Sequence, residues 1–137
     1  MDSLLTVDLM GSKTIPIKCY LYSPKKDYGM RVMLIYDTGA DKTSLTKDTL
    51  EYLGYTNFKQ SARMKRTALG VFSPPICDLS RLVIGNQFSL LNMPVDVMEI
   101  ENTPGFHGVI GMDFISRVES LISGSNNTLT ITGNLQD

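Results

Sequence analysis

The sequence predicts an all-β fold built as a single domain, and three observations carry that prediction. Apolar and polar residues alternate along several short segments, most clearly over Thr14–Tyr22, and this two-residue period is typical of a strand with one buried face. Clusters of Gly, Pro, Asn and Ser separate the segments, as at 23–29 and 124–127, and they predict turns. The 137 residues fit one domain without an internal repeat or a linker, so we treat residues 1–137 as one unit.

The first part of the chain predicts three strands. Ser3–Met10 and Thr14–Tyr22 alternate in hydrophobicity, and a short connection through Gly11 joins them. We therefore expect these two strands to pair as a hairpin. A turn-rich loop then leads into the apolar strand Val32–Tyr36, which ends on the carboxylate of Asp37.

A short helix and a projecting hairpin follow. The helix is expected over Thr46–Gly54, because Thr46 is a suitable N-cap and Gly54 a suitable stop. Residues 61–77 run out and back around a turn at Thr67–Gly70 and contain the adjacent prolines Pro74 and Pro75. Since proline lacks a donor for the strand ladder, this hairpin belongs at an edge or projects from the body.

The last part of the chain predicts more strands and a second helix. Gly108 and Gly111 enclose two apolar residues, which suits a backbone that passes close to another segment. Asp113 is then expected to cap a short helix over Phe114–Val118. The further strands are expected at Asp78–Ile84, Phe88–Leu91, Pro94–Met98, Ser120–Ser123 and Thr128–Thr132.

Composition and charge exclude several classes of protein. Hydrophobic residues make up 42% and charged residues 20% of the chain, which is typical of a globular domain and not of a disordered one. The net charge is −1 and no basic stripe is present, so nucleic acid is not the expected partner. No apolar run could cross a bilayer and no basic-then-apolar leader follows Met1, so we expect a cytoplasmic protein without a membrane segment.

The few cysteines and histidines argue against a metal site. Cys19 and Cys77 lie among apolar neighbours; we expect reduced packing residues, while a bridge between them stays open. His107 is the only histidine, and one His with two distant Cys does not make a zinc site. The prediction is therefore a protein with neither metal nor cofactor.

Asp37 is the strongest candidate for a catalytic residue. It follows an apolar strand directly, and a carboxylate at the end of such a strand is costly to desolvate. Thr38 adds a hydroxyl and Gly39 allows a tight turn or a close approach to a ligand. A turn aspartate that only caps its loop is the plainer alternative.

Two motifs together resemble the retropepsin-like aspartic proteases, and the pattern is closest to bacterial members. They are Asp37-Thr38-Gly39-Ala40 after an apolar strand, and the apolar-apolar-Gly element at 109–111 before a late helix. The order and size of the elements also match that family over most of the chain. The resemblance implies a retropepsin-like half-barrel with a flap hairpin, one short C-terminal helix and a further short helix after the catalytic loop.

The resemblance also implies a homodimeric aspartic endopeptidase. Peptide hydrolysis by aspartate needs one carboxyl as base and a second, protonated, as acid, and both hold one water. The chain has one Asp-Thr-Gly, so the second Asp37 would come from a symmetry-related copy. The terminal strands, Ser3–Leu9 and Thr128–Thr132, fall where the family builds its interface sheet.

The family's site residues are carried over position by position. Asp37 matches the catalytic aspartate, Thr38 the threonine that links the two loops across the dimer, and Gly39 the glycine that receives substrate backbone bonds, with Ala40 and Asp41 continuing that loop. The flap tip falls at Leu69, Gly70 and Val71. The positions that line side-chain pockets for a polypeptide substrate, with apolar residues expected around the scissile bond, are Phe106, His107, Val109 and Ile110.

The chain departs from the viral pattern after the late glycine. Viral members commonly have there an Arg that pairs with the acid of the motif loop, whereas this chain has Met112 followed by Asp113. The partner of Asp41 is therefore open, with Arg117 and Arg31 as candidates.

Two alternatives to a constitutive enzyme remain. One is a non-catalytic dimerisation or peptide-binding module that keeps the fold. The other is a dormant protease that dimerisation switches on, because a site made of two halves depends on protomer concentration.

Overall fold

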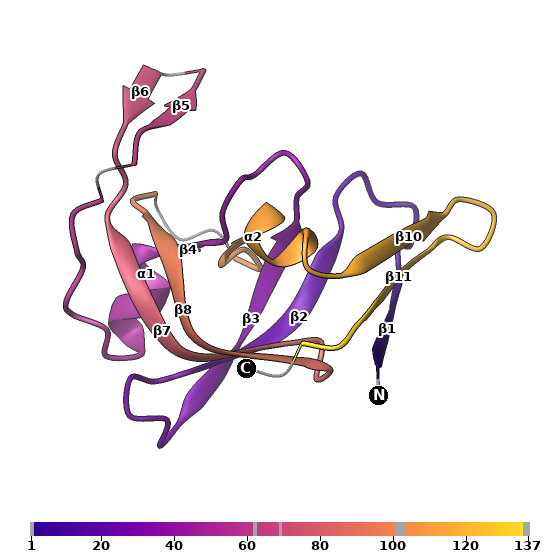
Figure 1. The fold of residues 1–137 in the computed structure, drawn as a ribbon, viewed down its shortest axis with the longest axis horizontal. Helices are drawn as coiled ribbons and strands as arrows, with labels where there is room; N and C mark the ends of the chain where they lie inside the picture. The colour runs from indigo at the N-terminus through magenta and orange to yellow at the C-terminus, as the bar shows by residue number, and fades with distance from the viewer. Residues whose placement is uncertain (1, 62, 69, 101–103, 136–137) are drawn as a thin grey trace.

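The computed structural model describes residues 2–61, 63–68, 70–100 and 104–135. The strands at its centre are β2 (Pro16–Tyr22), β3 (Gly29–Tyr36), β4 (Ser44–Thr46), β7 (Ile76–Ile84), β8 (Phe88–Met98) and β9 (Gly108–Ile110). They close into a barrel in the order β2-β3-β9-β4-β8-β7 (Figure 1). Two short helices, α1 (Lys47–Tyr52) and α2 (Met112–Ile115), accompany them. The all-β prediction is confirmed.

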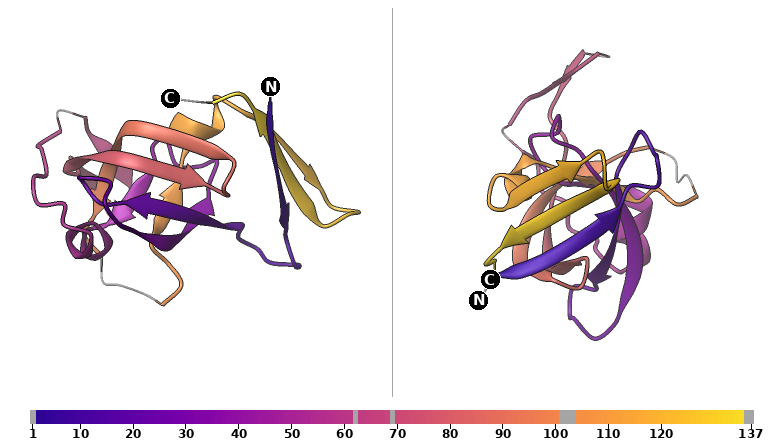
Figure 2. Two further views of the ribbon diagram at one scale, coloured as in Figure 1. Left: turned by 90° about the horizontal axis from the view of Figure 1, so that it is seen from below. Right: turned by 90° about the vertical axis from the view of Figure 1, so that its right-hand side faces the viewer.

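Two smaller sheets lie outside the barrel. The strands β1 (Ser3–Asp8), β11 (Thr128–Gly133) and β10 (Glu119–Ser123) form a sheet in the order β1-β11-β10, which we call the outer sheet. It sits beside one end of the barrel (Figure 2). The strands β5 (Lys65–Thr67) and β6 (Gly70–Phe72) pair only with each other and project from the body as the flap hairpin, as the two prolines predict (Figure 1).

The predicted N-terminal hairpin is wrong. Strand β1 pairs with β11, from Ser3 opposite Gly133 to Asp8 opposite Thr128, while β2 pairs with β3 and β7. The connection between β1 and β2 turns through Met10 and Gly11, both with positive φ, and it separates the two strands. Alternation identifies a strand with one buried face, but it does not identify the strand that pairs with it.

The helix predictions succeed once and fail once. Helix α1 begins after Thr46, whose hydroxyl accepts a hydrogen bond from the Thr49 amide, as predicted. Helix α2 begins at Met112 with Gly111 as its N-cap and without a side-chain cap, so the prediction that Asp113 caps a helix over Phe114–Val118 is wrong. Asp113 lies inside the first turn, and its carboxylate accepts hydrogen bonds from Thr43, which lies just before β4.

Strand β8 joins two strands that were predicted to be separate. Asn92 adopts a φ of 54° and Pro94 lies beyond it, yet the ladder to β7 continues past both, with Met93 opposite Leu79 and Pro94 opposite Asp78. On its other side β8 pairs with β4 only from Asp96 to Met98. Proline is tolerated here because no β4 partner stands beside it.

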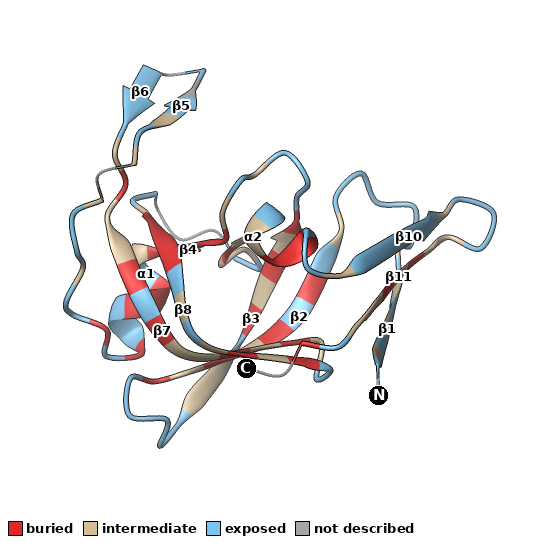
Figure 3. Ribbon diagram, in the orientation of Figure 1, coloured by how far each residue is buried: buried red, intermediate tan, exposed pale blue. Residues whose placement is uncertain are grey.

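The barrel interior holds the apolar core (Figure 3). Phe88 and Phe114 are fully buried and meet edge to face with ring centroids 5.6 Å apart. Leu34 on β3, Leu45 on β4 and Ile110 on β9 are also fully buried. Burial of a side chain of this size contributes roughly 1.5–3 kcal/mol, so the core fixes β3, β4 and β9, the three strands that position the site described next.

Candidate active site

Asp37 begins the loop between β3 and β4, at the surface of the single chain. Its amide donates to the carbonyl of Ile110 over 2.9 Å, and its carbonyl accepts from the Ala40 amide over 3.2 Å. One carboxylate oxygen accepts from the Gly39 amide over 2.9 Å. The backbone is therefore held in place while the side chain is exposed, which corrects the expectation of a desolvated carboxylate.

Two glycines let β9 pass close to this loop, as predicted. A Cβ added to Gly111 would lie 2.5 Å from the carbonyl carbon of Lys42, and one added to Gly108, at φ +155°, would lie 2.0 Å from the carbonyl oxygen of Ser44. Both contacts are with backbone atoms, which cannot move aside cheaply. Strand β9 therefore runs parallel to β3 and antiparallel to β4, and it closes the barrel under Asp37.

Asp113 holds the far end of the same loop. Its carboxylate accepts from the Thr43 amide at 3.0 Å and from the Thr43 hydroxyl at 2.8 Å. The Thr43 hydroxyl in turn accepts from the Gly111 amide at 3.2 Å, and the Met112 amide donates to the carbonyl of Ala40 at 2.8 Å. Helix α2 and the loop are thus tied together by hydrogen bonds at both ends.

Asp41 pairs with Arg63, not with either of the predicted candidates. One guanidinium nitrogen of Arg63 lies 2.8 Å from the Asp41 carboxylate, and the other hydrogen-bonds to the carboxylate of Asp96. Asp96 on β8 is 1% exposed, and Lys65 is 3.9 Å from the same oxygen. The hydrogen bond to Asp96 raises the pKa of Arg63, which secures its positive charge at every physiological pH.

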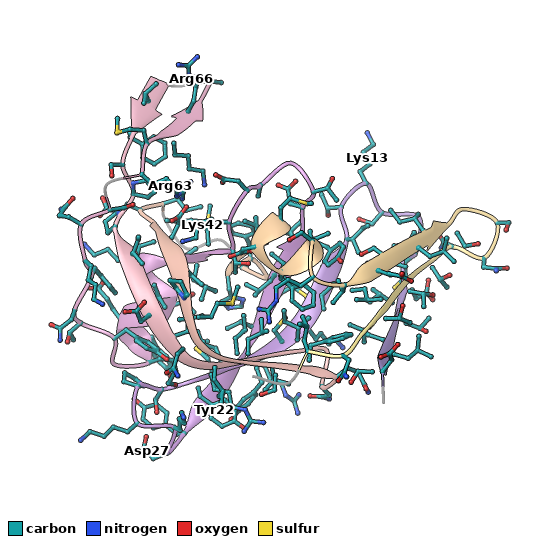
Figure 4. All side chains as sticks on the ribbon, viewed as in Figure 1. Lys13, Tyr22, Asp27, Lys42, Arg63 and Arg66 are labelled. Carbon is teal, nitrogen blue, oxygen red and sulfur yellow. The ribbon has the colours of Figure 1, made fainter. Side chains whose placement is uncertain are left out.

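Arg63 connects the flap hairpin to the Asp37 loop. It lies at the base of the hairpin, whereas Arg66 is near the tip (Figure 4). Sequence reasoning missed this residue, because its two partners are 22 and 33 positions away. A signal for Asp96 was available: it is an acid between Val95 and Val97 in an apolar strand, and a buried acid usually has a partner.

The flap residues lie as predicted, at the tip of the hairpin. Gly70 and Val71 belong to β6 and are exposed, and Gly70 has a φ of +130° that favours glycine. Leu69 lies outside the described residues. A role of these residues in covering a substrate stays a prediction.

The four predicted pocket residues are placed differently from one another. The His107 ring accepts from the Met33 amide over 2.9 Å, and its backbone bonds to Met33 and Thr46. Ile110 is fully buried in the core, while Phe106 and Val109 are partly exposed. The chain brings them together along β9 and the segment before it, and their part in substrate binding stays a prediction.

Among the described residues, no three His, Cys, Asp or Glu side chains are grouped closely enough to hold a metal ion. Cys19 and Cys77 are both buried and free. In the same part of the chain, no helix has the length and apolar character required to cross a membrane.

Comparisons with known proteins agree with this geometry. Residues 27–114 match the family described as Aspartyl protease, a range that includes the Asp37 loop and Gly111. No curated protein matches the chain in sequence. The structure is similar to a retropepsin-like aspartic protease from Rickettsia conorii, with a TM-score of 0.67 and 16% identity over 99% of this chain and 95% of that one. It is also similar to the retroviral protease-like domain of Ddi1 from Leishmania major, with a TM-score of 0.53 and 22% identity over 88% of this chain and 89% of that one.

Proposed function

The chain belongs to the aspartyl protease family and has a retropepsin-like fold, and from this premise we propose that it is a homodimeric aspartic endopeptidase. The observation that carries the proposal is the state of Asp37. Its backbone is fixed by β9 and by its own loop, and its carboxylate is exposed with one internal hydrogen bond, from Gly39. A carboxylate held this way can approach the Asp37 carboxylate of a second chain.

The proposed chemistry needs both copies. Two Asp37 carboxyls about 3 Å apart cannot both ionise, so they share one proton and titrate as a pair. The ionised carboxyl accepts a proton from the bound water as its oxygen attacks the peptide carbonyl carbon. The protonated carboxyl of the other copy gives its proton to the carbonyl oxygen. In the collapse of the tetrahedral species, the carboxyl that took the water's proton gives it to the amine nitrogen as the C–N bond breaks. The other carboxylate takes a proton from a hydroxyl of the same species as the carbonyl re-forms, so the pair again shares one proton.

The surrounding residues have distinct roles in this proposal. Thr38 links the two loops across the two-fold axis, Gly39 offers its backbone to the substrate, and Ala40 and Asp41 extend that surface. The flap around Gly70 closes over an extended peptide, which pairs by its backbone with both chains. Asp113 and Thr43 keep the loop rigid, which matters because small errors of position cost large factors in rate.

The test is cleavage of a diverse peptide pool from acid to neutral pH, read by mass spectrometry. Wild type is run beside Asp37→Asn, a variant that replaces one exposed carboxylate by a carboxamide of the same shape and should fold normally. We expect cuts from wild type that are absent from the variant. Equal patterns, or no cuts at concentrations where sedimentation shows a dimer, would contradict catalysis and leave a peptide-binding or dimerisation module. Loss of specific activity on dilution would identify a protease that dimerisation switches on.

A further inference from the structure

A cavity of about 370 Å³ lies between the base of the flap hairpin and the end of the barrel that carries the Asp37 loop. Phe72, Pro74 and Met98 give it apolar walls, and Lys65, Ser44 and Asp96 contribute polar groups. Volumes of this size are typical of sites for small organic groups. The cavity therefore has room for a side chain of a bound peptide.

Ser44 and Asp96 stand side by side in this cavity. They are directly opposed in the parallel pairing of β4 and β8, so their side chains project from the same face of the barrel wall. Ser44 is 0% exposed and Asp96 is 1% exposed. The Asp96 amide donates to the carbonyl of Thr43 over 3.0 Å, which fixes the register of the pair.

One oxygen from each of these residues has no protein partner in the described part of the chain. They are the hydroxyl oxygen of Ser44 and the carboxylate oxygen Oδ1 of Asp96. A buried polar atom without a partner costs roughly 1–3 kcal/mol, and native proteins contain few such atoms. Two of them on neighbouring strands in one cavity indicate a place where a polar group is received.

The chemistry of the two atoms selects the group. Oδ1 of an ionised carboxylate can only accept a hydrogen bond, whereas the Ser44 hydroxyl can both donate and accept. A carboxamide offers an N–H₂ donor and a carbonyl acceptor a short distance apart, so one amide can satisfy both oxygens. A hydrocarbon side chain would satisfy neither.

The charges around the cavity favour an uncharged guest. The second oxygen of Asp96 already bonds to Arg63, with Lys65 3.9 Å away, and Arg63 also pairs with Asp41. Arg63 and Lys65 thus face Asp96 and Asp41. Glu99, a third carboxylate of the cavity lining, is exposed to solvent, where its charge is screened. A cationic or anionic side chain would add an unbalanced buried charge, which is costly.

We propose that this cavity is a substrate subsite that binds the carboxamide of an Asn or Gln side chain, recognised by Ser44 and Asp96. The inference rests on the proposed peptidase function and adds a polar preference to the apolar one expected around the scissile bond. Phe72 brings the flap into the site, so closure of the flap and recognition of the amide occur together.

The experiment compares matched peptides. From a peptide that wild type cleaves, each position around the cut is replaced in turn by Asn, by Leu, which has a similar shape without the amide, and by Asp. At one position we expect kcat/KM for Asn to exceed that for Leu and for Asp by about tenfold, the loss typical of one unpaired buried polar group. In Ser44→Ala the Asn-to-Leu ratio should fall below about threefold. Equal ratios at every position, or a preference that Ser44→Ala leaves intact, would overturn the subsite.

The ratio is taken within each variant, so a change in the folded fraction cancels. Ser89→Ala is the matched control, because Ser89 lies on the same strand β8 but bonds to Arg81 and not to the cavity; its ratio should equal that of wild type. Ser44→Ala removes a buried hydroxyl without a protein partner, so its free energy of unfolding should not fall.

A binding measurement separates this inference from the proposed function. Asp37→Asn protein is titrated with the Asn and the Leu peptide, and the amide resonances of Ser44, Phe72 and Val97 are followed by NMR. Tighter binding of the Asn peptide with shifts at these residues supports the subsite even if wild type cleaves nothing. If wild type cleaves but the variant binds the two peptides equally, the subsite is contradicted while the peptidase function is supported. If a small free amide such as acetamide shifts these resonances and the two peptides do not differ, the subsite is also overturned.

Discussion

Phe114 in the barrel and Phe72 in the flap hairpin differ in nearly every contact they make. Phe114 is fully buried and meets Phe88 edge to face. Phe72 is 47% exposed on a strand whose three residues are all exposed. Among the described strands, those of the hairpin pair with none of the barrel, and a two-stranded hairpin alone is marginally stable in water.

The difference separates two tasks of the site. The barrel core fixes the Asp37 loop through β3, β4 and β9, while the hairpin is attached at its base, where Arg63 bridges to Asp41 and Asp96. A segment with few buried contacts opens at low free energy. In the proposed endopeptidase the hairpin must open to admit a polypeptide, which needs that property, and the Asp37 loop must position a carboxylate, which needs the opposite one.

The largest expected effect tests this contrast directly. Phe114→Ala should lower the free energy of unfolding by about 3–5 kcal/mol, because it leaves a cavity in the core. Phe72→Ala should change it by less than about 0.5 kcal/mol, as for other surface substitutions. Urea unfolding followed by circular dichroism measures both. Similar losses for the two variants would show that the hairpin is part of the cooperative core.

The second effect concerns the attachment of the hairpin. Arg63→Gln leaves Asp96 buried with Lys65 at 3.9 Å as its remaining described cation, and we expect a loss of about 2 kcal/mol, below the range for fully buried pairs because Arg63 is 28% exposed. Arg63→Gln combined with Asp96→Asn should be more stable than Arg63→Gln alone, since no buried charge is then unpaired. Arg66→Gln, an exposed arginine of the same hairpin, is the control and should have no effect. If both arginine variants behave alike in urea unfolding, the bridge contributes nothing.

The contrast between barrel and hairpin also explains what the sequence could predict. Local features were readable: the alternation of β2, the Thr46 cap of α1, the prolines that exclude the hairpin from the barrel, and the glycines around Val109 and Ile110. Each of these depends on the residue itself and its immediate neighbours.

Pairings between distant segments could not be read. The partner of β1 is β11, and their nearest paired residues, Asp8 and Thr128, are 120 positions apart in the sequence. Alternation carries no information about that choice. The partner of Asp41 is an arginine at the base of the hairpin, and Asp113 accepts hydrogen bonds from Thr43 as well as from the Phe114 amide of its own helix. These contacts depend on how the barrel closes, so the sequence could not show which residues support the Asp37 loop, and the roles of Asp37 and its neighbours stay predictions.

The outer sheet offers the next test, because we expect it to form the interface between the two chains of the proposed homodimer. Leu4 and Leu121 are large apolar residues that the strand register places on one face of this sheet. Their exposed fractions are 55% and 67%, which suits an interaction surface. If the sheet forms the proposed homodimer, Leu121→Asn should weaken dimerisation at least tenfold while unfolding of the monomer stays within about 0.5 kcal/mol.

Sedimentation at several concentrations measures that change. Tyr52→Ser is the control, because Tyr52 is 77% exposed on α1, on the other side of the barrel from β10 (Figure 1). A dimer as strong in Leu121→Asn as in wild type, or equally weakened by Tyr52→Ser, would place the interface elsewhere.

The smallest effect probes the interior of the barrel through pH. Burial raises the pKa of the Cys19 thiol from its ordinary 9.0 to about 12. Well below pH 9 the thiol is protonated in both the folded and the unfolded chain, so the full contribution of the buried neutral thiol to the free energy of unfolding is present. As the pH rises above 9, the unfolded chain loses the proton first and that contribution is lost progressively until about pH 12.

At pH 9.5 this loss should amount to about 0.8 kcal/mol relative to pH 7, from half a unit above the ordinary pKa. Cys19→Ala lacks the thiol, so its free energy of unfolding should fall by that much less over the same interval, whatever its absolute stability. The change between the two pH values is decisive, because a packing defect lowers the free energy of unfolding by the same amount at both. A slope identical to that of wild type would mean that the interior around β2 admits water to the thiol, and the barrel would then resemble the hairpin more than its burial suggests.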